Sequence, residues 1–220
     1  MPLQSKLQRQ CPPPKDETLG DLRFRALLSA SDWAALPVPI RRRFSKRVAG
    51  GETAVYSGLV EHTCLSRLGW LFAQLARLCG GPLPLAELSG VPAVVSVTED
   101  MVTGGQIWTR LYARRDGFPQ IIHSSKRFAG PTGLEEYVGR GVGMELTVHV
   151  EKDALLFRSA RYFFRIGRLG FSLPSWLTPG ALTVTHAELG EGCFTFTLDV
   201  VHPFFGPVVH QHAVFREVVS

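Results

Sequence analysis

The chain has 220 residues, of which 45% are hydrophobic, so it is long enough to bury one large core. Its formal net charge is +5. No run of about eighteen apolar residues occurs, which excludes a membrane-spanning helix and argues against stable membrane insertion. Residues 1–10 lack the apolar core of a secretory signal, so we expect a cytoplasmic protein.

The amino-terminal part divides into a leader and a helical region. Residues 1–17 contain three consecutive prolines among polar residues, which predicts a flexible leader, and residues 18–220 are expected to form a single domain. Apolar residues recur at helical spacing from Leu22 to Trp33, until Pro37 ends the pattern. A second short helix is predicted over residues 40–47.

A basic cluster lies within the second predicted helix. It consists of Arg41, Arg42, Arg43, Lys46 and Arg47. Such a cluster is typical of a solvated helix face, and it also fits an acidic surface, nucleic acid or anionic lipid. No aromatic residues alternate with these charges as single-strand binding requires, so we expect no nucleic-acid partner.

Residues 54–64 alternate as a first strand, and the clearest helix follows over residues 65–79. Its apolar positions recur at intervals of three and four residues, and Gly80-Gly81-Pro82 ends the helix. Its broad apolar stripe predicts that it packs on a sheet.

The rest of the chain reads as one strand after another, with period-two alternation bounded by turn residues. The fold class is therefore α+β: amino-terminal helices, then a strongly curved antiparallel sheet or barrel of about eight to ten strands with one helix packed on it. We expect strands at residues 93–99, 106–114, 120–128, 143–151, 154–166, 181–189, 193–202 and 207–218.

Several motifs together resemble a known family. They are Trp108-x-Arg110-x-Tyr112, Phe118, Leu134-x-Glu136-x-x-Gly139, Leu173-Pro174-x-Trp176-Leu177-x-Pro179 and His202-Pro203-x-x-Gly206. In this order they resemble the bacterial family described as domain of unknown function 4166, over residues 20–218. The resemblance implies an uncharacterised module that is often carboxy-terminal to a reductase-like domain, which makes a reductase-like protein a candidate partner, and it implies no catalytic residues. Family members commonly have an aromatic-x-Gly element where this chain has His210-Gln211-His212.

The best candidate binding residue is Arg110, between Trp108 and Tyr112 on one face of a strand. If that face points inward, a guanidinium lies among aromatic rings and suits a carboxylate, an enolate or a phosphate on an apolar ligand. The alternative is an outward arginine whose stem covers its neighbours. We also expect His210 and His212 to contribute to ligand binding.

Cofactor and metal motifs of useful specificity are absent from the sequence, so none is predicted. The four cysteines show no C-x-x-C spacing. His210 and His212 share a strand face and could supply two metal ligands, and His186 and His202 are possible additional ligands. No aspartate or glutamate lies near them at a spacing of two residues. Glu136 and His202 are weak candidates for a catalytic acid or base.

Three functions stay open at this stage. The barrel could bind a small hydrophobic or amphiphilic molecule, lipid-like or polyketide-like; it could be an isomerase or cyclase acting on such a molecule; or it could be an interaction module with a lumen filled by Trp108, Tyr112, Phe163 and Phe196. Two apolar loops, residues 171–177 and 204–206, either plug one end or form a mouth, a membrane-facing lip or a docking surface.

Overall fold

The computed structural model describes residues 20–50, 52–167 and 169–218, so the leader predicted over residues 1–17 lies outside the described residues. None of the described helices is long and apolar enough to cross a membrane. The helical elements are all short. They are η1 (Arg25–Leu27), α2 (Ala30–Ala35), α3 (Val38–Phe44), α4 (Arg67–Ala76), η2 (Arg77–Cys79) and η3 (Ser175–Leu177).

The strands of the described residues form one antiparallel sheet. Each strand predicted from the sequence is present, and β5 and β8 were not predicted. The strands are β1 (Ala54–Leu65), β2 (Ser89–Asp100), β3 (Gly105–Tyr112), β4 (Gln120–Arg127), β5 (Glu135–Gly139), β6 (Val142–Glu151), β7 (Ala154–Ile166), β8 (Leu169–Ser172), β9 (Ala181–Gly190), β10 (Cys193–His202) and β11 (Gly206–Glu217).

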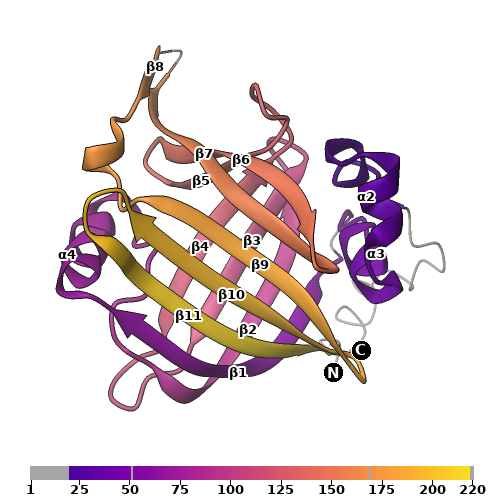
Figure 1. Ribbon diagram of the computed structural model, residues 1–220, viewed down its shortest axis with the longest axis horizontal. Helices are drawn as coiled ribbons and strands as arrows, with labels where there is room; N and C mark the ends of the chain where they lie inside the picture. Colours follow the sequence, from indigo (N-terminus) through magenta and orange to yellow (C-terminus); the bar gives the residue numbers. More distant parts are fainter. Residues whose placement is uncertain (1–19, 51, 168, 219–220) are drawn as a thin grey trace, which may run out of the picture.

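The sheet closes on itself. Its order is β6-β5-β4-β3-β2-β1-β11-β10-β9-β7-β8, and an additional pairing of β6 with β7 joins ten strands into a barrel. Strand β8 pairs with β7 alone and extends beyond the barrel wall. Figure 1 shows α2 and α3 at one end of the barrel and α4 at the other. The predicted curved sheet or barrel with a packed helix is confirmed.

The first predicted helix is wrong in extent. Instead of a continuous helix from Leu22, the chain forms η1, becomes extended at Leu28, and begins α2 after Ser29. The Ser29 hydroxyl accepts a hydrogen bond from the Asp32 backbone N–H at 3.0 Å, which makes Ser29 the helix cap. A serine hydroxyl competes well for the first free N–H groups of a helix, so the break falls there.

Aromatic side chains from the amino-terminal elements fill the barrel end under α2 and α3. Phe24 and Phe44 pack edge to face with centroids 5.3 Å apart, and Phe24 also contacts Phe157 of β7 in the same geometry. Ile40 of α3 is fully buried beside them. This packing closes one end of the barrel.

Register irregularities change which residues face inward along two strands. In β1 the pairing with β11 shifts between Val60 and His62, so the buried position after Val60 is Thr63 and His62 is exposed. The alternation predicted over residues 54–64 places Val60 and His62 on one face, so the shift corrects that prediction at His62. In β7 a similar shift lies between Ser159 and Arg161.

Helix α4 is held close against β11 by a glycine. A Cβ atom on Gly69 would lie 1.9 Å from the Val208 carbonyl oxygen, and the Ser66 hydroxyl caps the helix by accepting from the Gly69 N–H at 3.0 Å. The helix therefore crosses one end of the barrel beside β11 and β1.

Gly69→Ala is expected to displace α4 and to lower the free energy of unfolding by about 1–3 kcal/mol, because backbone atoms cannot yield to the new methyl group. Urea unfolding measures this change. Gly20→Ala is the matched control, since nothing lies within 4 Å of a Cβ at Gly20. An equal loss in both variants would contradict the close contact.

Candidate functional site

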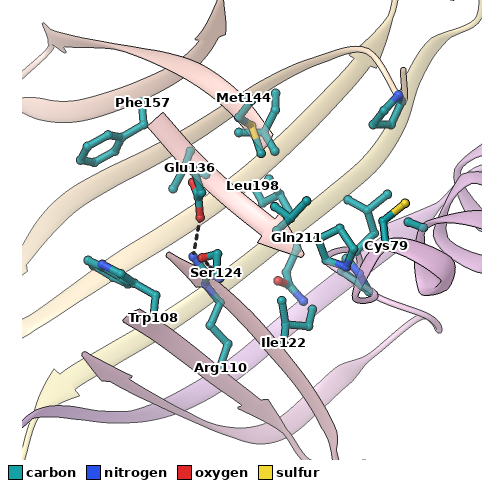
Figure 2. A pocket seen from close by; sticks show the side chains of 18 of the residues that line it. Cys79, Trp108, Arg110, Ile122, Ser124, Glu136, Met144, Phe157, Leu198 and Gln211 are labelled. Carbon is teal, nitrogen blue, oxygen red and sulfur yellow. Dashed lines mark hydrogen bonds and ion pairs between the residues drawn. The ribbon is translucent and has the colours of Figure 1, made fainter. Parts of the chain in front are cut away.

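A cavity of about 320 Å³ lies inside the barrel, at the end that α4 covers. Its size is within the range of small-molecule sites, roughly 300–1,000 Å³. Most of the wall is apolar: Figure 2 shows Ile122, Met144, Phe157 and Leu198 around the space. The lumen is thus not filled by the bulky rings, because Trp108, Tyr112 and Phe196 line the cavity and leave room.

The alternation of side chains along β3 points three candidate binding residues into the cavity. Trp108, Arg110 and Tyr112 all line the cavity, as the spacing predicts for one strand face. The Trp108 indole donates to the Gln106 side-chain oxygen at 3.1 Å, which fixes its ring against the wall. The Tyr112 side chain is buried, and burial raises the pKa of its phenol.

Charged groups from three neighbouring strands meet at this wall. The Lys126 ammonium of β4 donates to Glu136 Oε2 of β5 at 2.8 Å. Arg110 Nη2 of β3 lies 3.5 Å from Glu136 Oε1, and Arg110 Nη1 donates to the Ser124 hydroxyl at 3.1 Å. Figure 2 shows Arg110 and Glu136 pointing toward each other. We refer to Arg110, Lys126 and Glu136 as the charged triad.

Burial and the neighbouring charges set the ionisation of the triad. Burial by itself opposes the charged form of Glu136, but the adjacent Lys126 and Arg110 outweigh it and lower the pKa to about 2. Burial lowers the pKa of Lys126, and the charge of Glu136 partly opposes that effect. Glu136 is therefore a carboxylate at neutral pH.

The triad carries two basic groups against one carboxylate. Arginine stays protonated at any ordinary pH, and Glu136 engages Lys126 more closely than Arg110. The guanidinium of Arg110 thus keeps hydrogen-bonding capacity toward an incoming anion in an apolar cavity, where charge-assisted bonds are strong. A Glu136 carboxylate with a pKa near 2 is a poor general acid or base.

Two further polar side chains, Tyr162 and Gln211, lie on the wall away from the triad. Tyr162 donates its hydroxyl to the Gly180 carbonyl at 2.9 Å, and burial raises its pKa to about 12. The Gln211 amide donates to the Thr63 hydroxyl at 2.9 Å. These groups are already paired within the protein, so Arg110 is the polar group best placed to select a ligand.

The histidine candidates do not line the cavity. Strand β11 turns Gln211 and Ala213 inward, so His210 and His212 lie on the outer face. There His210 Nε2 is 3.0 Å from His62 Nε2, and His210 Nδ1 is 2.7 Å from Asp199 Oδ1. Within the described part of the chain, no group of three or more histidine, cysteine or carboxylate side chains is placed to hold a metal ion.

Two further histidines are buried away from the cavity. His202 packs against Phe72 and Phe205, and its Nδ1 accepts from the Phe204 N–H at 3.2 Å. His186 lies under the plugged end of the barrel, where burial lowers its pKa to about 3. The structure therefore brings together Trp108, Arg110, Tyr112 and Glu136, and it leaves His186, His202, His210 and His212 outside the cavity.

Lys126 and Ser124 also line the cavity and were not predicted from the sequence. Both share the inward face of β4 with Ile122, and period-two spacing within the predicted strand at residues 120–128 was the available signal. That signal was ambiguous, because both faces of this strand carry polar residues. Phe163 was a candidate for filling the lumen, yet it packs with Tyr137 outside it.

One comparison with known proteins gives a match. A family model described as Domain of unknown function (DUF4166) matches residues 36–215, which confirms the resemblance seen in the motifs. No curated protein and no solved structure matches the chain significantly.

Proposed function

The chain belongs to the DUF4166 family, and we propose that its barrel binds a small amphiphilic molecule, lipid-like or polyketide-like, with an apolar body in the cavity and an acidic head at Arg110. One observation carries this proposal: an apolar cavity of about 320 Å³ contains a triad with more basic than acidic groups. The apolar wall favours an apolar body over a strongly polar solute. The excess of basic groups favours an anionic head on that body.

Arg110→Ala tests the proposed head-group contact. The variant should bind a long-chain fatty acid more weakly by about 1.5–3 kcal/mol, because a charge-assisted hydrogen bond is lost. It should bind the methyl ester of that acid about as well as the unmodified protein does. Isothermal titration with both probes measures the difference.

Arg158→Ala is the matched control, because Arg158 pairs with Glu151 on the exposed wall. Native mass spectrometry of the freshly purified protein gives an independent readout, since a retained molecule identifies the ligand class. Equal affinities for acid and ester in the unmodified protein would contradict the assignment of Arg110.

An isomerase or cyclase is the second candidate, and Lys126 is the observation that favours it. Burial lowers the pKa of Lys126, which brings this lysine closer to the range of a general base, and its ion pair with Glu136 opposes that effect. Incubation of the protein with a candidate ligand, followed by mass spectrometry of the extract, distinguishes the two: an altered ligand supports catalysis, and an unaltered one supports binding alone.

A non-catalytic module for a reductase-like partner is the third candidate. It predicts that no small molecule occupies the cavity in the purified protein. We also propose that residues 18–220 form a single domain and that the protein is cytoplasmic. Both proposals rest on the sequence patterns described above.

A further inference from the structure

All the connections at one end of the barrel can be assigned from its antiparallel topology. The carboxyl end of β1 lies at the same end as the turns β3–β4, β5–β6 and β10–β11 and the connection from β7 to β9. Figure 1 shows α4 and β8 here, opposite α2 and α3. We call this the cavity end. Leu75 and Leu177 both line the cavity and are more than half exposed, so the cavity reaches the surface here.

Large apolar side chains surround this opening and face solvent. The exposed fraction reaches 75% at Phe204 and 61% at Trp176. Monomeric proteins seldom expose so many large apolar residues together unless the surface has a partner. We call this set the apolar rim: Trp70, Leu71, Leu75 and Leu78 from α4 and η2; Ile166, Leu169, Phe171, Trp176 and Leu177 between β7 and β9; and Phe204 and Phe205 from the β10–β11 turn.

The charges around the rim are almost all positive. Residues 66–86, 137–142, 162–181 and 202–209 contain no aspartate or glutamate, and the exposed carboxylates of the adjoining connections are Glu87, shortly before β2, and Asp116, in the β3–β4 turn. Five exposed arginines belong to these segments, and none of them forms an ion pair within the described residues. They are Arg67, Arg77, Arg114, Arg115 and Arg140.

The opposite end of the barrel has a different composition. Its carboxylates include Asp21, Glu188 and Glu217, each of which pairs with a nearby cation. Fewer large apolar residues are exposed at that end, and Met101 and Val102 of the β2–β3 turn form its most exposed neighbouring pair. The combination of apolar tips, unpaired arginines and scarce carboxylates is thus a property of the cavity end.

We propose that the cavity end docks on the surface of an anionic lipid bilayer. Aromatic and aliphatic tips on separate loops enter the boundary between headgroups and acyl chains, a liquid layer that accommodates protruding side chains without a matching shape. The arginines contact the lipid phosphates, and the negative surface potential of the bilayer attracts basic residues that lie near it. Docking places the cavity opening against the lipid, and it does not require that the cavity hold a ligand.

Vesicle flotation tests the proposal. The full chain should float with vesicles that contain phosphatidylglycerol and should float much less with phosphatidylcholine alone. Binding should weaken as salt is added, because salt screens the arginines. Failure of the unmodified protein to float with anionic vesicles, or equal flotation with both, would overturn the proposal.

A pair of variants locates the contact on the barrel. Phe204→Ala with Phe205→Ala should lower the vesicle affinity by at least about tenfold, because two exposed rings no longer enter the apolar layer. Met101→Ala with Val102→Ala removes similarly exposed apolar side chains at the opposite end and should leave the affinity unchanged. A loss as large in the second variant would place the contact elsewhere and overturn the assignment.

Tryptophan emission provides a second readout. Trp33 and Trp108 are buried, whereas Trp70 and Trp176 belong to the apolar rim. Anionic vesicles should therefore shift the emission to shorter wavelength, and Trp176→Phe should reduce the shift. A soluble protein that occupied the rim and abolished vesicle binding in a purified mixture would instead make this surface a protein interface.

Discussion

Glu136→Gln is expected to lower the free energy of unfolding by about 3–5 kcal/mol, because it leaves the buried Lys126 beside the partly buried Arg110 without a counter-charge. Urea unfolding at neutral pH measures the loss. Glu151→Gln is the matched control, since its pair with Arg158 is exposed on both sides and should contribute less than about 1 kcal/mol.

A second variant shows whether the cause is the unpaired lysine. Lys126→Met combined with Glu136→Gln removes both members of the closest pair and should be less destabilised than Glu136→Gln alone. The Lys126→Met single variant completes the comparison. If the double variant loses as much free energy of unfolding as the sum of the two single variants, the two side chains are not coupled and their pairing does not stabilise the fold.

The triad also predicts an acid-sensitive component of stability. The pKa of Glu136 is lowered from its ordinary 4.5 to about 2 in the folded chain, so its carboxylate stabilises the fold above about pH 4.5 and this contribution is lost as pH falls toward 2. The difference corresponds to a loss on the order of 3 kcal/mol. Glu136→Gln should therefore show a flatter dependence of stability on pH across this range.

Arg43→Met is expected to lower the free energy of unfolding by a similar amount, about 3–5 kcal/mol. Arg43 of α3 points into the plugged end, where its Nη2 lies 3.3 Å from Glu188 Oε2 and its Nη1 lies 2.7 Å from His186 Nε2. The guanidinium also lies 3.8 Å from the centroid of the Phe194 ring. Removing it leaves the Glu188 carboxylate buried without a partner.

The neighbouring arginine is the natural control for this prediction. The Arg42 side chain is 79% exposed and lies 3.9 Å from Glu217, so Arg42→Met should cost less than about 1 kcal/mol. Thermal or urea unfolding of the two variants measures the contrast. Equal small losses would show that Arg43 does not hold α3 on the barrel, and the basic cluster would then be a solvated face throughout.

The charge of Arg43 also bears on acid stability. Burial, assisted by Arg43, lowers the pKa of His186 to about 3, below its ordinary 6.5. The neutral imidazole thus stabilises the fold above about pH 6.5, and the contribution is lost as pH falls toward 3. Part of any acid unfolding in this interval belongs to His186.

The local sequence pattern was sufficient to predict nine of the eleven described strands and three residues that line the cavity. The alternation of β3 predicted that Trp108, Arg110 and Tyr112 share a face, and all three line the cavity. The stripe of α4 predicted a packed helix, but not that Trp70 and Leu71 remain exposed on its outer side. Periodicity reports which residues share a face; it does not report what covers that face.

The pairing of strands that are distant in sequence determined which partners the buried charges have and which residues face inward. Glu135 and Glu136 are consecutive carboxylates that do not suggest a strand, yet β5 turns Glu135 to Arg165 and Glu136 to Lys126. A shift of one residue in β1 moved His62 to the exterior. The sequence by itself determined most of the elements and the fold class, because periodicity and turn residues act locally. Only the closed barrel determined the charged triad and the cavity, because each buried charge depends on a partner that the register of another strand supplies.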